Sequence, residues 1–319
     1  TRKLDWIYSL QIGVKVFKKI TKKFLIKNFH ELFMNEKIKE ILGEYRKYES
    51  ISHAQRLLNW DLETYMPQGG IEIRGEVISN LELMQQEFFY RIKEKVESIE
   101  DRDLDDFERG IVRRLKRDIH FYVSIPPEIL KDLSKVTTES SVVWREARKK
   151  GDFSRFSPYL ERIVEIERII AEKLGYENHP YNALLDLFEE GFTVDDADNV
   201  FGTIQNKCKP ILEKIISDGR FSRKHPLERK KYDVKRMEML NRKVLEILEM
   251  PMDRFRMDVS AHPFTTSISI NDVRITTRYE GINFKSTFYS TIHESGHAIY
   301  ELQKDPQLEF TPVKGAPSL

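Results

Sequence analysis

The sequence predicts a mainly α-helical fold, organised as one large helical domain with a small antiparallel β-hairpin beside a helix near its end. Apolar residues recur at helical spacing through most of the chain, which is 33% charged and 40% hydrophobic. The helical residue pattern is interrupted once, at residues 262–279, where β-branched residues alternate with other residues on both sides of Asn271-Asp272. No internal repeat or long linker is evident, so we expect a single domain over residues 34–319.

Helix boundaries follow from prolines, glycines and capping residues. Pro126-Pro127 opens one helix and Gly151 closes it, whereas Ser157-Pro158 opens the next, which Gly175 ends. Thr193 with Asp196 predicts an N-terminal cap. The expected helices cover about 34–66, 72–97, 105–123, 127–149, 157–174, 194–217 and 226–249.

Residues 1–33 are expected to form a basic extension outside the domain. They carry eight Lys or Arg against Asp5 and Glu31, a net charge of +6, and Met34 looks like a natural start for the domain. A basic amphipathic segment that touches membranes or acts as a targeting arm is the alternative. The segment lacks a clean helical stripe, which favours a simple extension.

Charge and cysteine usage exclude several classes of protein. The whole chain has a net charge of +1, so the residues after 33 sum to −5, which argues against nucleic acid as a partner. No run of eighteen apolar residues exists, so no membrane span is predicted. The single cysteine, Cys208, rules out an internal disulfide framework and predicts a reduced, cytoplasmic location.

The motif that organises the prediction is His-Glu-x-x-His at residues 293–297. On a helix, His293 and His297 share one face with about 6 Å of rise between them. Two imidazoles there can hold one divalent metal ion, for which zinc is best suited and cobalt possible. Glu294 can reach a water activated by that metal, so we predict it as the catalytic general base and the two histidines as metal ligands.

The residues around the motif predict a helix that packs through an apolar stripe. Asn283 stands at the expected N-cap and Pro306 lies just past the expected end. The predicted stripe consists of Phe284, Phe288, Ile292, Ile299 and Leu302. A surface or core helix that carries two histidines by chance is the alternative.

Three motifs in order resemble those of one known family. His262-Pro263-Phe264, Asp272-Val-Arg274-Ile-Thr276 and His293-Glu294-Ser-Gly-His297 are similar to the markers of the thermostable, Taq-type zinc metallocarboxypeptidases. The segment Trp60–Pro67 and the run Tyr181–Asp186 also look like theirs. The resemblance covers about Met34 to Leu319.

The resemblance implies a helical metallopeptidase domain with a deep substrate groove, commonly in a homodimer. It implies peptide substrates, from which single C-terminal amino acids are released with broad side-chain tolerance. It also makes His262, Arg274 and Thr276 candidates for the substrate cleft. The alternative is structural, since His262 could shape the strand and Asp272 could form a salt bridge with Arg274 within the hairpin.

The same resemblance places the third metal ligand, a Glu, beyond Leu319, together with segments that help bind the substrate carboxylate. Catalytic zinc takes three protein ligands and a water. Glu301 lies roughly 12 Å along the helix from His293, so it cannot join both histidines on one ion. Asp305 and Glu309 lie past the expected end of the helix, and no sequence pattern supports either of them as the third metal ligand. The metzincin pattern also fails, because Tyr300 and Gln303 stand where it needs Gly and His.

We therefore expect residues 34–319 to be the N-terminal and central part of a metallocarboxypeptidase domain that lacks its C-terminal part. For this chain alone we expect weak metal binding and little or no turnover. Two other functions stay open. One is a non-catalytic truncated fragment or interaction module, and the other is an endopeptidase of another His-Glu-x-x-His type.

Overall fold

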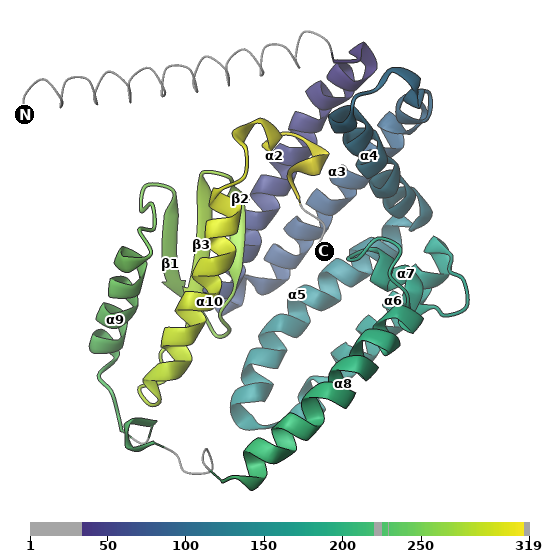
Figure 1. The fold of residues 1–319 in the computed structure, drawn as a ribbon. Coiled ribbons are helices and arrows are strands. Elements are labelled where there is room, and N and C mark those ends of the chain that lie inside the picture. The colour runs from purple at the N-terminus through teal and green to yellow at the C-terminus, as the bar shows by residue number, and fades with distance from the viewer. Residues whose placement is uncertain (1–33, 220–224, 229, 316–319) are drawn as a thin grey trace, which may run out of the picture.

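A computed structural model describes residues 34–219, 225–228 and 230–315, so the predicted basic extension lies outside the described residues. The fold is mainly α-helical, as predicted, and the small sheet that the described residues form lies beside the helix of the histidine motif (Figure 1). The helices are α2 (Glu36–Thr64), α3 (Ile71–Glu97), α4 (Asp106–Ser124), α5 (Pro127–Lys150), α6 (Ser157–Leu174), α7 (Tyr181–Asp186), α8 (Val194–Ser217), α9 (Val234–Ile247) and α10 (Phe284–Leu302). The strands are β1 (Phe255–Val259), β2 (Thr265–Ser269) and β3 (Asp272–Thr277). None of the described helices combines the length and apolar character that a bilayer span requires.

Local capping chemistry sets several helix ends where the sequence predicts them. α5 begins at Pro127 and ends against Gly151, whose φ of 67° lies in the left-handed region that favours glycine. Thr193 and Asp196 form a reciprocal capping box at the start of α8. The helix expected from residue 226 is shorter than predicted: α9 begins at Val234, because the Asp233 side chain accepts a hydrogen bond from the Arg236 amide.

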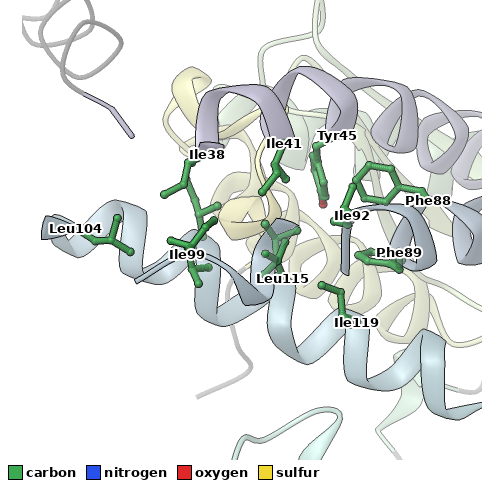
Figure 2. Packing of buried hydrophobic residues seen from close by; sticks show 13 residues of the cluster. Ile38, Ile41, Tyr45, Phe88, Phe89, Ile92, Ile99, Leu104, Leu115 and Ile119 are labelled. Atoms are coloured by element: carbon green, nitrogen blue, oxygen red, sulfur yellow. The ribbon is translucent and has the colours of Figure 1, made fainter. Parts of the chain in front are cut away.

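The largest apolar core lies where α2, α3 and α4 pack together, and Figure 2 shows its side chains. Phe89 of α3 is fully buried and stacks on Tyr122 of α4, with ring centroids 4.6 Å apart and an interplanar angle of 8°. The buried members of this cluster include Ile38, Ile41, Tyr45, Phe88, Ile92, Ile111, Leu115 and Ile119. This core fixes α2, which also contacts β2.

The sheet is mixed, with strand order β1-β3-β2. β2 and β3 form the predicted antiparallel hairpin, with Thr265 opposite Ile275. β1 was not predicted, and it pairs parallel to β3 with Met257 opposite Ile275. The prediction of a wholly antiparallel sheet is therefore wrong in this one strand. Phe255–Val259 alternates apolar and polar residues, but such alternation does not reveal which strand it pairs with or in which direction.

α10 packs on β3, β2 and α9, but its buried face differs from the predicted apolar stripe. The buried residues of the helix are Thr287, Thr291, Glu294, Ser295 and Ala298. Of the predicted stripe, Ile292 is exposed, while Ile299 and Leu302 pack at the edge of a cluster around Val273 and Ile275. Asn283 does occupy the N-cap position, although its side chain makes no capping hydrogen bond.

Small and polar residues on this face let the helix approach the sheet closely. Thr287 lies 2.9 Å from Thr277 of β3, measured between hydroxyl oxygens, and accepts a hydrogen bond of 2.8 Å from Asn241 of α9. These contacts satisfy the hydroxyls of Thr277 and Thr287, whereas the buried hydroxyl of Ser295 on the same face has no hydrogen-bond partner among the described residues. The remaining face of α10 is left for the histidines.

We predict that Phe89→Ala lowers the free energy of unfolding by about 3–5 kcal/mol, because a large aromatic side chain is lost from a filled core. Tyr90→Ala is the matched control, since Tyr90 is the next residue on α3 and is 44% exposed. It should change stability by about 0.5 kcal/mol or less. Urea denaturation of both variants measures the difference, and equal losses would contradict this packing.

Candidate metal centre

His293 and His297 point their ring nitrogens at one another from successive turns of α10. Their Nε2 atoms lie 3.3 Å apart, and the rings are nearly perpendicular, at 84°, with centroids separated by 4.8 Å. Two nitrogen ligands of a tetrahedral zinc ion, each at about 2.0–2.1 Å, are separated by about 3.3–3.4 Å. The pair therefore has the spacing of two ligands of one zinc ion, and both side chains are accessible from solvent.

Glu294 lies beside the pair and is held by a threonine that the sequence analysis did not select. The Thr265 hydroxyl donates to Glu294 Oε2 at 2.5 Å and lies 3.1 Å from the main-chain oxygen of the same residue. Glu294 is only 8% exposed. Its carboxylate is thus tied to β2, so the strand sets the orientation of the predicted general base.

Glu294 and Thr265 line a cavity of about 460 Å³ at the junction of α2, β2 and α10. Arg56 of α2 also lines this cavity. Its guanidinium forms an ion pair with Glu49 and donates a hydrogen bond of 3.2 Å to the Ile268 carbonyl oxygen. The lining residues are Arg56, Thr265, Thr266, Ser267, Glu294, His297, Tyr300 and Glu301. A concave site of this volume, with a few convergent polar groups, is typical of small-ligand sites.

The described part of the chain brings no third metal-binding side chain to the two histidines. Both oxygens of Glu301 lie within 2.8 Å of Lys304 Nζ. Asp305 caps the Gln307 amide, and Glu309 accepts hydrogen bonds from the Ile270 amide and from Lys314. These carboxylates are thus engaged elsewhere.

Two of the three cleft candidates make structural contacts. Arg274 forms a two-pronged ion pair with Asp272, with both distances 2.7 Å, and its guanidinium lies 4.3 Å from the centroid of the Trp60 ring. Thr276 is fully buried and accepts hydrogen bonds from the Ser260 hydroxyl and the Phe264 amide.

His262, the third candidate, is exposed and meets Trp144 edge-to-face, with ring centroids 6.4 Å apart. None of the three lines the cavity beside Glu294. The salt bridge within the hairpin is present, and a role for these residues in substrate binding stays a prediction.

The sequence profile of the family described as Carboxypeptidase Taq (M32) metallopeptidase matches residues 40–319. The chain belongs to this family. Membership of a metallopeptidase family implies a metal cofactor, and the histidine pair has the spacing and the donor chemistry to bind one.

Among proteins similar to this M32 chain is thermostable carboxypeptidase 1 of Pyrococcus furiosus, 46% identical over 295 residues, which cover 91% of this chain and 59% of the relative. Carboxypeptidase 1 of Bacillus subtilis is 32% identical over 291 residues, or 88% of this chain and 57% of that protein. A structure of the Pyrococcus furiosus carboxypeptidase matches with a TM-score of 0.80 at 45% identity, covering 89% of this chain and 58% of that one. The M32 chain therefore spans somewhat under three fifths of the length of these relatives.

Two larger cavities lie along α4. One of about 730 Å³ shares Arg56, Ser267 and Glu301 with the cavity beside Glu294, and another of about 860 Å³ lies next to it. Asp118 lines both. Burial raises the pKa of its carboxyl from 3.8 to about 6, although Arg114, with a nitrogen 3.0 Å away, opposes the shift.

We predict that Asp118→Asn removes a pH-dependent loss of stability. The pKa of Asp118 is higher in the folded state than in the unfolded state, so its contribution to stability is present below pH 3.8 and is lost as the pH rises through about 6. Between pH 4 and pH 7 the wild type should lose up to about 3 kcal/mol relative to the variant. Urea denaturation at both pH values measures this, with Asp106→Asn on the surface as the control, and a difference that does not vary with pH would contradict it.

Proposed function

We propose that this M32 chain carries the metal-binding and general-base half of a zinc-dependent carboxypeptidase site. The whole enzyme would release single C-terminal amino acids from peptides with broad side-chain tolerance. The observation that carries the proposal is the 3.3 Å spacing of the two imidazole nitrogens beside a carboxylate fixed by Thr265. The carboxypeptidase names of the relatives support the reaction class.

In this proposal His293 and His297 hold the metal, for which zinc is the first choice and cobalt the second, since both accept imidazole nitrogen. Bound zinc supplies a lowered pKa for the attacking water and polarises the scissile carbonyl group. Thr265 occupies Glu294 Oε2, so we assign Oε1 to the proton transfer. Glu294 takes the proton from the attacking water and delivers it to the departing amine.

We further propose that the third metal ligand comes from outside the described residues. Within the described ranges only the two histidines converge, and the nearby carboxylates have other partners. With two of three ligands, the chain alone should bind metal weakly and turn over little substrate. The homodimer and the cytoplasmic location stay predictions.

Metal binding should depend on the histidine pair and on no other histidine of the hairpin region. Loss of a group that only hydrogen-bonds to a metal ligand weakens metal binding about 10–100-fold, so His297→Ala, which removes a proposed ligand itself, should weaken zinc binding by about tenfold or more. His262→Ala is the matched control, because this exposed histidine lies outside the cavity beside Glu294. Calorimetric titration with zinc, and visible absorption with cobalt, measure both variants.

An unchanged affinity in His297→Ala, or an equal loss in His262→Ala, would place the metal elsewhere. One tightly held ion per wild-type chain after dialysis would contradict the expectation of an incomplete ligand set.

Peptide hydrolysis should require Glu294 and a free substrate C-terminus. With excess zinc, we expect slow release of C-terminal residues by the wild type, and Glu294→Gln should reduce the rate by about 10²–10⁴-fold, or to background. A peptide amidated at its C-terminus should stay intact. Mass spectrometry of the products measures all three reactions.

The same assay separates the alternatives. Internal cleavage of the amidated peptide would indicate an endopeptidase. No hydrolysis of either peptide with zinc bound would indicate a non-catalytic fragment or interaction module. Wild-type rates in Glu294→Gln would remove this residue from the mechanism.

A further inference from the structure

The sheet presents different side chains on its two faces. Side chains alternate between the faces along a strand, and Val273 and Ile275 of β3 face α10, where they pack with Ala298. Arg274 lies between these two residues in β3 and therefore points to the other face. Arg256 of β1 is its partner in the parallel register, so both arginines lie on the face away from α10.

Trp60 of α2 lies against this second face. The guanidinium groups of Arg274 and Arg256 lie over its ring, with their central carbons 4.3 Å and 5.0 Å from the ring centroid. The indole is 7% exposed, and its Nε1 has no hydrogen-bond partner among the described residues. The ring is therefore held through its π system, by cation–π contacts with the two arginines, and not through its N–H group.

Each arginine is fixed by a carboxylate of its own strand. Asp272 accepts two hydrogen bonds of 2.7 Å from Arg274, and Asp258 accepts two from Arg256. The partners are two residues apart in a strand, so their side chains lie on the same face. The carboxylates offset the like charges of the arginines and hold the planar guanidinium groups against the ring.

α2 crosses the strands of the sheet in their spatial order. Arg56 donates a hydrogen bond of 3.2 Å to the Ile268 carbonyl oxygen of β2. Trp60, one helical turn later, meets the arginines of β3 and β1. The Tyr65 hydroxyl, directly after the helix, donates to Asp258 of β1 at 2.6 Å. Since the strand order is β1-β3-β2, α2 is fastened to all three strands.

We propose that Trp60 is a positioning residue of the candidate site. α2 and α10 pack on opposite faces of the sheet, and the cavity beside Glu294 lies where α2, β2 and α10 meet. Arg56, one turn from Trp60 on the same face of α2, lines this cavity, as do Glu294 and His297. The stack of Trp60 on the two arginines thus sets where the α2 wall of the cavity stands. The proposal rests on the proposed function for the roles of Glu294 and His297, but not for the stack itself.

The stack also gives a role to Arg274, which the family resemblance made a candidate for the substrate cleft. Its side chain is 13% exposed, is paired with Asp272 and points away from α10. A peptide carboxylate would have to displace Asp272 in order to bind it. In this proposal Arg274 therefore acts on the site through α2, and not by contact with the peptide.

A double-mutant cycle tests the stack. Trp60→Leu and Arg274→Met each remove one partner, so their effects should be coupled by about 5–30-fold in the unfolding equilibrium constant, as expected for a desolvated cation–π contact. Trp60→Leu with Arg242→Met is the control cycle, because Arg242 is exposed on α9 and pairs with Glu238. Its coupling should be about twofold or less. Urea denaturation measures both cycles, and additive effects of Trp60→Leu and Arg274→Met would overturn the proposal.

The position of α2 relative to α10 is the second measurement, and it needs neither metal nor turnover. Asn59→Cys on α2 and Tyr289→Cys on α10, both at exposed positions, carry nitroxide labels in a Cys208→Ser chain, which has no other cysteine. Pulsed electron paramagnetic resonance gives the distribution of distances between the labels. It should be narrow in this chain and with Trp60→Phe, which keeps a ring for the arginines. It should be broader or shifted with Trp60→Leu and with Arg274→Met, and the latter carries the test if Trp60→Leu does not fold.

Ile166→Ala separates positioning from a general loss of stability. Ile166 is fully buried in a cluster to which α2 contributes no residue, so this variant should be less stable and yet keep the narrow distribution. The same broadening with Ile166→Ala, or an unchanged distribution with Arg274→Met, would overturn the proposal. Labels that respond as expected in a chain that hydrolyses no peptide would support the stack and count against the proposed function alone.

Discussion

The close approach of α10 to the hairpin is the contact on which the candidate site depends. Thr287, Thr291, Ser295 and Ala298 present small or hydroxyl-bearing side chains to the sheet, and the larger Ile299 and Leu302 pack at the edge of this contact. Glu294 is thereby brought within hydrogen-bonding distance of Thr265 on β2. Because that face of the helix packs on the sheet, His293 and His297 lie on the opposite face and are exposed to solvent.

Much of this arrangement could be predicted from the sequence, because the relevant signals are local. The i, i+4 histidines define one helix face, and proline, glycine and the Thr193–Asp196 box mark helix ends. The face of α10 that is buried could not be predicted in the same way. Hydrophobicity favoured Ile292, whereas the sheet selects small residues, and that preference exists only once helix and strand have met. The Thr265–Glu294 contact joins residues 29 apart, so it likewise depends on tertiary packing.

The candidate metal centre and the comparisons bear on the same question. Two imidazole nitrogens have the spacing of zinc ligands, and no third metal-binding side chain lies near them within the described ranges. The match covers somewhat under three fifths of the length of the relatives. Both observations support the proposal that a third ligand comes from outside the described residues.

The most direct test of the proposed site is the position of the metal itself. Crystals of the protein soaked in zinc, with diffraction recorded on both sides of the zinc absorption edge, locate the ion without reference to activity. The account predicts one anomalous peak at about 2.0–2.1 Å from Nε2 of both His293 and His297, with Glu294 beside it but not bound to it. A peak that engages only one of the two histidines, or one that lies at Glu301 or Glu309, would contradict it.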